Sequence, residues 1–289
     1  MARNNAGRTG APTGTEETDE LVEDIAPASS NGDSLSFVSP TEFVELPSEG
    51  KYYPAGHPLQ GQETIEIRYM TAKDEDIITS PALLKRGMAI ERLMENLIVD
   101  KRVKAHDLLV GDRSAIVMAA RVGAYGSDYQ TNVTCPRCNS ITTATFDLNE
   151  VQTYSGDEWG DFDIKETPTG TFIVTLPRSK AQVEIRLTTG RDEKLLQQTQ
   201  KKKKKYNISE GSTTEVMKLF VVSVNGTTDR ASIIKFVENM PAFDARYLRV
   251  AHNKVTPKID TMQDFTCSQC QYETELEVPF TTDFFWPKQ

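Results

Sequence analysis

Apolar and polar residues alternate over positions 63–70, Glu-Thr-Ile-Glu-Ile-Arg-Tyr-Met. A period of two with β-branched residues on one face is typical of a half-buried strand. Thr71 precedes Asp74 by three residues, a spacing that places a capping hydroxyl and a carboxylate at a helix start. We therefore expect a helix over about 74–85, bent or split at Pro81, because a proline ring disrupts a helix interior.

Helical periodicity resumes after position 89, where apolar residues recur at i, i+3, i+4, i+7 and i+8 and predict an amphipathic helix. These residues are Ile90, Leu93, Met94, Leu97 and Ile98. A further helix is expected over about 112–122. Alternating segments at 129–134 and 142–148 then flank the turn Cys135-Pro-Arg-Cys138. This pattern predicts a strand, a tight turn with two cysteines (here called a knuckle) and a second strand.

The second half of the chain repeats this order, because residues 183–193 align with residues 65–75. The identical pairs are Glu66/Glu184, Ile67/Ile185, Arg68/Arg186, Thr71/Thr189, Asp74/Asp192 and Glu75/Glu193. A Leu-Pro pair precedes each segment, at 46–47 and at 176–177. Helices are then predicted at about 214–224, 229–239 and 241–252. The second knuckle is Cys267-Ser-Gln-Cys270, between the strand-like segments 263–266 and 272–278.

A repeated order of elements indicates an internal duplication. The predicted fold class is α+β, with two similar lobes that each contain a small antiparallel sheet, about three helices and a CxxC zinc knuckle. We place the first lobe at 36–150 and the second at 170–289, joined by an acidic connector over 151–169. Residues 1–35 are predicted to be a disordered acidic tail, because they contain too few apolar residues to form a core. A short docking motif around Leu21–Ile25 is an alternative use of that tail.

The overall composition narrows the classes of function. The 289 residues carry a formal net charge of −9, which argues against a surface built mainly to neutralise phosphates. No apolar run approaches the length of about 18 residues required to span a bilayer, and no signal peptide is apparent. We therefore expect a protein that is made and used in a cytosol, without membrane contact, and whose cysteines stay reduced.

The four cysteines have the spacing of metal ligands. Two CxxC turns between strands are the paired knuckles of a zinc ribbon, in which four thiolates bind one structural zinc. The predicted ligands are Cys135, Cys138, Cys267 and Cys270. The long separation of the two knuckles fits two lobes that meet at a pseudo-twofold axis and share one ion. One alternative is a redox CxxC pair, but such a pair opens a helix, whereas strand-like residues follow both knuckles here. The other is a set of core or surface thiols that bind no metal.

Other features allow more than one reading. We find no catalytic motif, and the three histidines, at 57, 106 and 252, have no metal-ligand spacing. Lys201–Lys205 form a basic run that reads as a solvated loop or helix end, with an anionic partner as the alternative. The aromatic segment 279–286 is expected either to pack against its own domain or to anchor a partner.

Several segments resemble the baseplate hub protein family of T-even-type myophages. They are Phe43–Pro54, Met70–Ile77, Leu97–Asp100, Asp107–Asp112, Asn239–Ala242, Arg246–Arg249 and Asp283–Pro287, together with the two knuckles. The resemblance spans about 43–287. It implies a role in building the hub of a contractile tail baseplate, and it brings no catalytic residues with it.

The function expected from these observations is non-enzymatic. We expect a structural or assembly protein of the baseplate hub, acting through protein–protein contacts in the virion baseplate or in the host cytoplasm during assembly. Its expected partners are other hub or tail proteins, with the tape-measure protein as a further candidate. One alternative is a chaperone that holds the tape-measure protein soluble and is absent from the mature virion. Another is a nucleic-acid-binding zinc ribbon, which requires a basic face around the knuckles.

Overall fold

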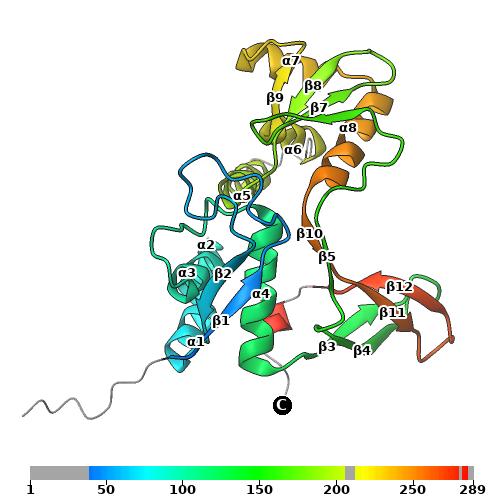
Figure 1. Ribbon diagram of the computed structural model, residues 1–289. Helices are drawn as coiled ribbons and strands as arrows, with labels where there is room; N and C mark the ends of the chain where they lie inside the picture. The colour runs from blue at the N-terminus through cyan, green and yellow to red at the C-terminus, as the bar shows by residue number, and fades with distance from the viewer. Residues whose placement is uncertain (1–38, 206–211, 280–281, 286–289) are drawn as a thin grey trace, which may run out of the picture. The chain divides into compact units, whose positions relative to one another are not determined.

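The computed structural model describes residues 39–205, 212–279 and 282–285 (Figure 1). The predicted acidic tail 1–35, with its segment Leu21–Ile25, lies outside the described residues. The part of the chain that is described forms eight α-helices and five small sheets whose strands all pair antiparallel. The predicted α+β class is therefore confirmed.

The first half begins with a two-stranded hairpin followed by four helices. Their bounds are β1 Thr41–Glu45, β2 Thr64–Arg68, α1 Ala72–Thr79, α2 Pro81–Arg86, α3 Ala89–Leu97 and α4 Val110–Tyr125. Pro81 is the first residue of α2, so the predicted helix over 74–85 is split there. The apolar stripe of α3 is buried as its periodicity predicted, with Leu93 and Leu97 fully inaccessible to solvent.

The second half is built around a four-stranded sheet in the order β6-β7-β8-β9. The strands are β6 Ile164–Glu166, β7 Phe172–Thr175, β8 Gln182–Ile185 and β9 Val221–Val224. The helices are α5 Gly190–Lys205, α6 Ser212–Phe220, α7 Arg230–Asn239 and α8 Ala242–Val255. The helix predicted over 214–224 is wrong after Phe220, because Val221, Val222 and Val224 are β-branched residues in a strand paired with β8.

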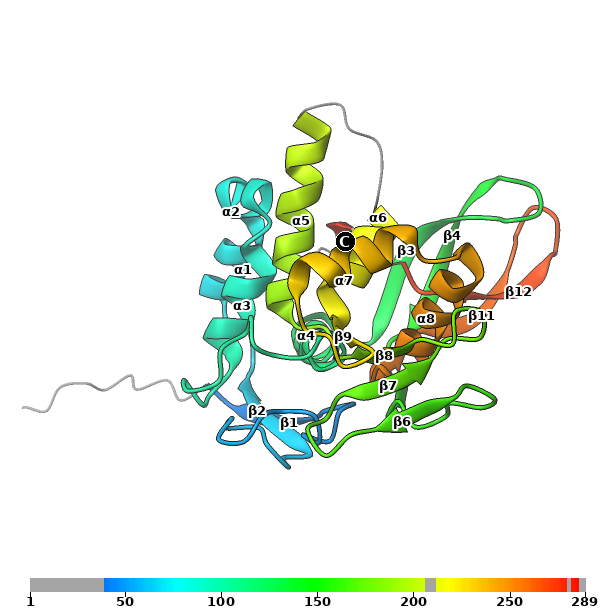
Figure 2. The ribbon, with the colours of Figure 1, turned by 90° about the horizontal axis from the view of Figure 1, so that it is seen from above.

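Two hairpins carry the knuckles and lie side by side in both views (Figures 1 and 2). They are formed by β3 Asp128–Thr134 with β4 Ile141–Asp147, and by β11 Met262–Thr266 with β12 Glu273–Glu277. A short ladder pairs β5 Gln152–Tyr154 with β10 Lys258–Asp260. The stretch 151–169, expected to be a connector, thus contains β5 and β6, and each pairs with a strand from residues 170–289.

The strands of the two halves have matching registers. In β1–β2, Glu42 lies opposite Ile67, and in β7–β8 Phe172 lies opposite Ile185 at the corresponding positions. The knuckle hairpins match in the same way. Thr134 pairs with Ile141 in the first hairpin, and Thr266 pairs with Glu273 in the second. In each case the strand leading into the knuckle and the strand leaving it are paired in the same register.

An arginine–aspartate pair with a buried aspartate and a partly exposed arginine recurs in each half. Arg68 donates two hydrogen bonds to Asp74, at 2.7 and 2.9 Å. Arg186 donates two to Asp192, at 2.8 and 2.7 Å. The aspartate also accepts from the backbone N–H of the capping threonine, at 2.9 Å in both halves. The repeated T-x-x-D segment therefore ties the end of a strand to the start of a helix.

A second aspartate in each half accepts hydrogen bonds from the residues that follow the Leu-Pro pair. Asp112, in the first turn of α4, accepts from the backbone N–H and hydroxyl of Ser48 at 3.0 and 2.6 Å. Asp244, in the first turn of α8, accepts from the backbone N–H groups of Arg178 and Ser179 at 2.9 and 2.8 Å. Each aspartate precedes the first cysteine of its knuckle by the same number of residues.

Candidate metal centre

Each knuckle is a tight turn held by backbone hydrogen bonds. In the first, Cys135 donates its N–H to the carbonyl of Ser140, and Asn139 donates to the carbonyl of Cys135, both at 2.9 Å. Asn139 adopts a left-handed conformation with φ of 56°, which a short polar side chain tolerates. The turn thus directs both cysteine side chains to one side of the hairpin end.

The second knuckle has the same geometry. The N–H of Cys267 donates to the carbonyl of Tyr272, and the N–H of Gln271 to the carbonyl of Cys267, again at 2.9 Å. Gln271 is left-handed with φ of 54°, at the position that corresponds to Asn139. Two turns of different sequence therefore adopt the same backbone conformation.

The four sulfur atoms lie together, as the sequence analysis predicted for a shared site. The Sγ atoms of Cys135 and Cys270 are 3.8 Å apart, and those of Cys138 and Cys267 are also 3.8 Å apart. All four Sγ atoms lie within 4.8 Å of one another. Both of these 3.8 Å pairs join one knuckle to the other, so the centre belongs to both hairpins.

These distances fit a tetrahedral zinc ion and no disulfide. A Zn–S bond of about 2.3 Å requires an edge of about 3.8 Å between sulfur atoms in a regular tetrahedron. A disulfide requires about 2.05 Å between sulfurs, far shorter than the separations here. The four thiols are therefore compatible with zinc, with all coordination positions filled by protein.

Zinc binds the ionised form of a cysteine thiol, and backbone N–H donors favour that form at Cys267. The N–H of Cys270 points at the sulfur of Cys267 and lowers the pKa of that thiol to about 6. Desolvation by burial instead raises the pKa of Cys270 to about 12. A dication between the sulfurs would offset that cost, because metal ligation deprotonates a thiol outright.

Two neighbouring side chains at this centre were not anticipated from the sequence. The hydroxyl of Ser140 lies 2.9 Å from the sulfur of Cys138 and 3.7 Å from that of Cys267. The guanidinium of Arg137 lies over the ring of Tyr272, 5.6 Å from its centroid, and so links the knuckles a second time. Ser140 has no sequence signal of its own, because only the packing of the two hairpins brings it to the opposite knuckle.

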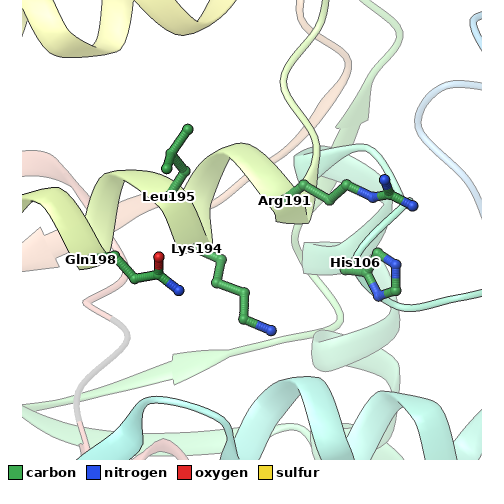
Figure 3. A pocket seen from close by; sticks show the side chains of 5 residues that line it. All are labelled: His106, Arg191, Lys194, Leu195 and Gln198. Atoms are coloured by element: carbon green, nitrogen blue, oxygen red, sulfur yellow. The ribbon is translucent and has the colours of Figure 1, made fainter.

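A second cluster of metal-ligating groups, Glu91, Glu95 and His106, lies beside the start of α5. A pocket of about 430 Å³ adjoins it, and Figure 3 shows His106, Arg191 and Lys194 among the residues that line this pocket. Lys194 is 3.0 Å from a carboxylate oxygen of Glu91 and supplies the positive charge that a metal ion would otherwise provide. The cluster is thus an ion-pair network that joins the two halves.

The basic run and the C-terminal aromatics can now be placed in part. Lys201 is exposed in α5, and its ammonium donates to the carbonyl of Arg86 at 3.2 Å. The backbone of 201–205 is helical and ends α5, so the basic run is a helix end and not a loop, because Gln and Lys are good helix formers. Phe284 and Phe285 are buried in the described segment 282–285, which confirms packing against the chain itself.

The fold and this centre define a mixed α+β protein with a four-cysteine cluster shared by two hairpins. Residues 39–165 match the family model described as T4 bacteriophage base plate protein. This match supports the resemblance to a T4-type phage baseplate family over residues 39–165. It includes the first knuckle and ends before the second. No curated protein and no solved structure matches the chain.

Proposed function

We propose that this protein is a structural or assembly component of the baseplate hub of a contractile phage tail. The observation that carries the proposal is the family match over residues 39–165. A baseplate family suggests a non-enzymatic role in the virion baseplate, in contact with other baseplate proteins. Assembly in the host cytoplasm, and the tape-measure protein as a partner, are finer parts of the proposal. Within the described residues, no helix is both long and apolar enough to cross a membrane.

One structural zinc ion is the second part of the proposal. Its ligands are Cys135, Cys138, Cys267 and Cys270, whose separations suit four Zn–S bonds. With no open coordination position, the ion would have no catalytic role. It would instead hold the two hairpins together, so that residues far apart in the chain move as one body.

An internal duplication is the third part. Its support is the recurrence of contacts beyond the aligned residues: the arginine–aspartate pairs, the aspartates at the starts of α4 and α8, and the shared registers. The proposed lobes keep the boundaries 36–150 and 170–289, with 151–169 between them. The proposed zinc then lies where equivalent hairpins meet, which explains the long separation of the knuckles.

Nucleic-acid binding is disfavoured by the charge on the second hairpin. The exposed face of β11–β12 carries four carboxylates, at Asp264, Glu273, Glu275 and Glu277. Phosphate backbones are repelled by such a face, since their recognition depends on Lys and Arg. Arg137 is the only lysine or arginine within either knuckle. Protein–protein contact is therefore the better-supported role.

The proposal is tested by deleting the gene from its phage and supplying the protein from a plasmid. We expect the deletion to stop assembly at a stage without complete baseplates, and the protein to be found by mass spectrometry in purified baseplates. Normal baseplates without the protein would refute the proposal. Requirement for assembly combined with absence from both baseplates and virions would identify a chaperone instead.

A further inference from the structure

A groove of about 310 Å³ runs along α4, between β1 and the β5–β10 ladder. Four residues of α4 at i, i+3, i+4 and i+7 form one wall, namely Ala115, Met118, Ala119 and Val122. The opposite walls include Val44, Leu148, Val151 and Ile259. Ala115 and Met118 are buried by the chain itself, whereas Ala119 and Val122 stay partly exposed in the groove.

The groove also contains a carboxylate without a partner. Glu42 lines it, and the Oε1 atom of Glu42 is buried with no hydrogen-bond donor among the described residues. The lining includes a second carboxylate, Glu45, and no lysine, arginine or histidine. A desolvated, unpaired carboxylate oxygen is costly, so a cation or a strong donor that reached it would be favoured.

The second half shows what covers the corresponding face there. Phe172 holds the register position of Glu42 and is fully buried, with Trp159 5.8 Å from it between ring centroids. On α8, Tyr247 packs against Phe162 at 4.6 Å and accepts a hydrogen bond from the backbone N–H of Asp163. A turn of the same chain, residues 159–163, thus places aromatic side chains over that face.

We infer that the groove along α4 binds a segment of a neighbouring baseplate protein, which places a lysine or arginine side chain on Glu42. The aliphatic stem of such a side chain packs on Ala119 and Val122, while its charged end pairs with the carboxylate of Glu42. The inference rests on the proposed function for the existence of that neighbour. It adds the surface used and the chemistry of the segment that binds.

Two variants test the groove in the phage complementation system. Ala119→Arg fills the groove and brings a competing cation to Glu42, and we expect the plaque titre to fall at least a hundredfold. Ser114→Arg is the matched control, because Ser114 is exposed on the same helix outside the groove lining. We expect its titre to stay within about threefold of wild type. Equal titres for both variants would overturn the inference.

Glu42→Leu separates docking from folding. Removing an unpaired buried carboxylate should leave the melting temperature unchanged or raised, whereas loss of the partner's cation contact should lower the plaque titre at least tenfold. A lowered melting temperature with wild-type titre would show that Glu42 serves only the fold, and would overturn the inference. If Ala119→Arg fails to fold, this variant still decides the question.

Sedimentation of the purified protein tests whether the occupant of the groove is a second copy of this chain or a different protein. We expect wild-type protein and Ala119→Arg to have the same mass in solution, because the occupant is a different protein. A wild-type dimer that Ala119→Arg dissociates would assign the groove to a second copy and overturn the inference. If baseplates form without the protein, the proposed function fails. If they need it and Ala119→Arg supports them fully, only the groove inference fails.

Discussion

Replacing one ligand of the shared cysteine centre should affect the whole protein. Cys267→Ser removes a fully buried sulfur from the second hairpin, and Cys135→Ser removes its counterpart from the first. Because each hairpin supplies two of the four ligands, either change leaves three. We expect both variants to lose zinc and to be destabilised by similar amounts.

The magnitude follows from the length of chain that the proposed ion would close. Cys138 and Cys267 are 129 residues apart in sequence. A cross-link that closes a loop of this length lowers the entropy of the unfolded chain by the equivalent of about 5 kcal/mol at 25 °C. For a protein of this size, each kcal/mol shifts the melting temperature by about 2–4 °C. The upper limit is therefore a loss of about 10–20 °C.

Two measurements check this expectation. Native mass spectrometry should give one zinc per chain for wild type and none for either variant, and calorimetry should show a single transition moved to lower temperature. If either variant still bound one zinc per chain, the assignment of the ligands would be contradicted. A separate low-temperature transition in Cys267→Ser, with the main transition unmoved, would show that the ion does not join the two halves.

Two further predictions concern the polar contacts of the core. Burial alone would raise the pKa of Asp74, but the hydrogen bonds from Arg68 and Thr71 outweigh it and lower the pKa to about 2. This carboxylate therefore contributes about 2 kcal/mol at neutral pH, lost as the pH falls from about 4 to about 2. Urea unfolding of the Asp74→Asn variant should not show this loss of stability at low pH. A variant with the same acid dependence as wild type would contradict the reasoning. Arg121 is fully buried and donates to the carbonyls of Phe284, Gly126 and Asp128. Arg121→Ala leaves these acceptors unpaired and should cost about 3–5 kcal/mol in the same assay. The exposed Arg102→Ala is its control and should leave stability unchanged.

Local patterns in the sequence identified most of the elements of the first half. The alternation in 63–70 gave β2, and the stripe from Ile90 to Ile98 gave α3. These signals are strong because the period of the apolar residues is set by backbone geometry within a single element. Prediction failed at Val221, where a helix gives way to a strand at the edge of a sheet. That choice depends on pairing with β8, which local sequence does not encode.

For the candidate centre, the sequence by itself determined the ligand types. CxxC between strand-like segments fixes two sulfurs on one side of a turn, whatever the rest of the fold does. Only the tertiary structure decided that the two knuckles meet, with cross-knuckle sulfur distances of 3.8 Å. It also decided that Ser140 lies between them and that Glu42 lines an apolar groove. The physical reason is the same in each case: these contacts join residues far apart in the chain, and their formation depends on how whole elements pack.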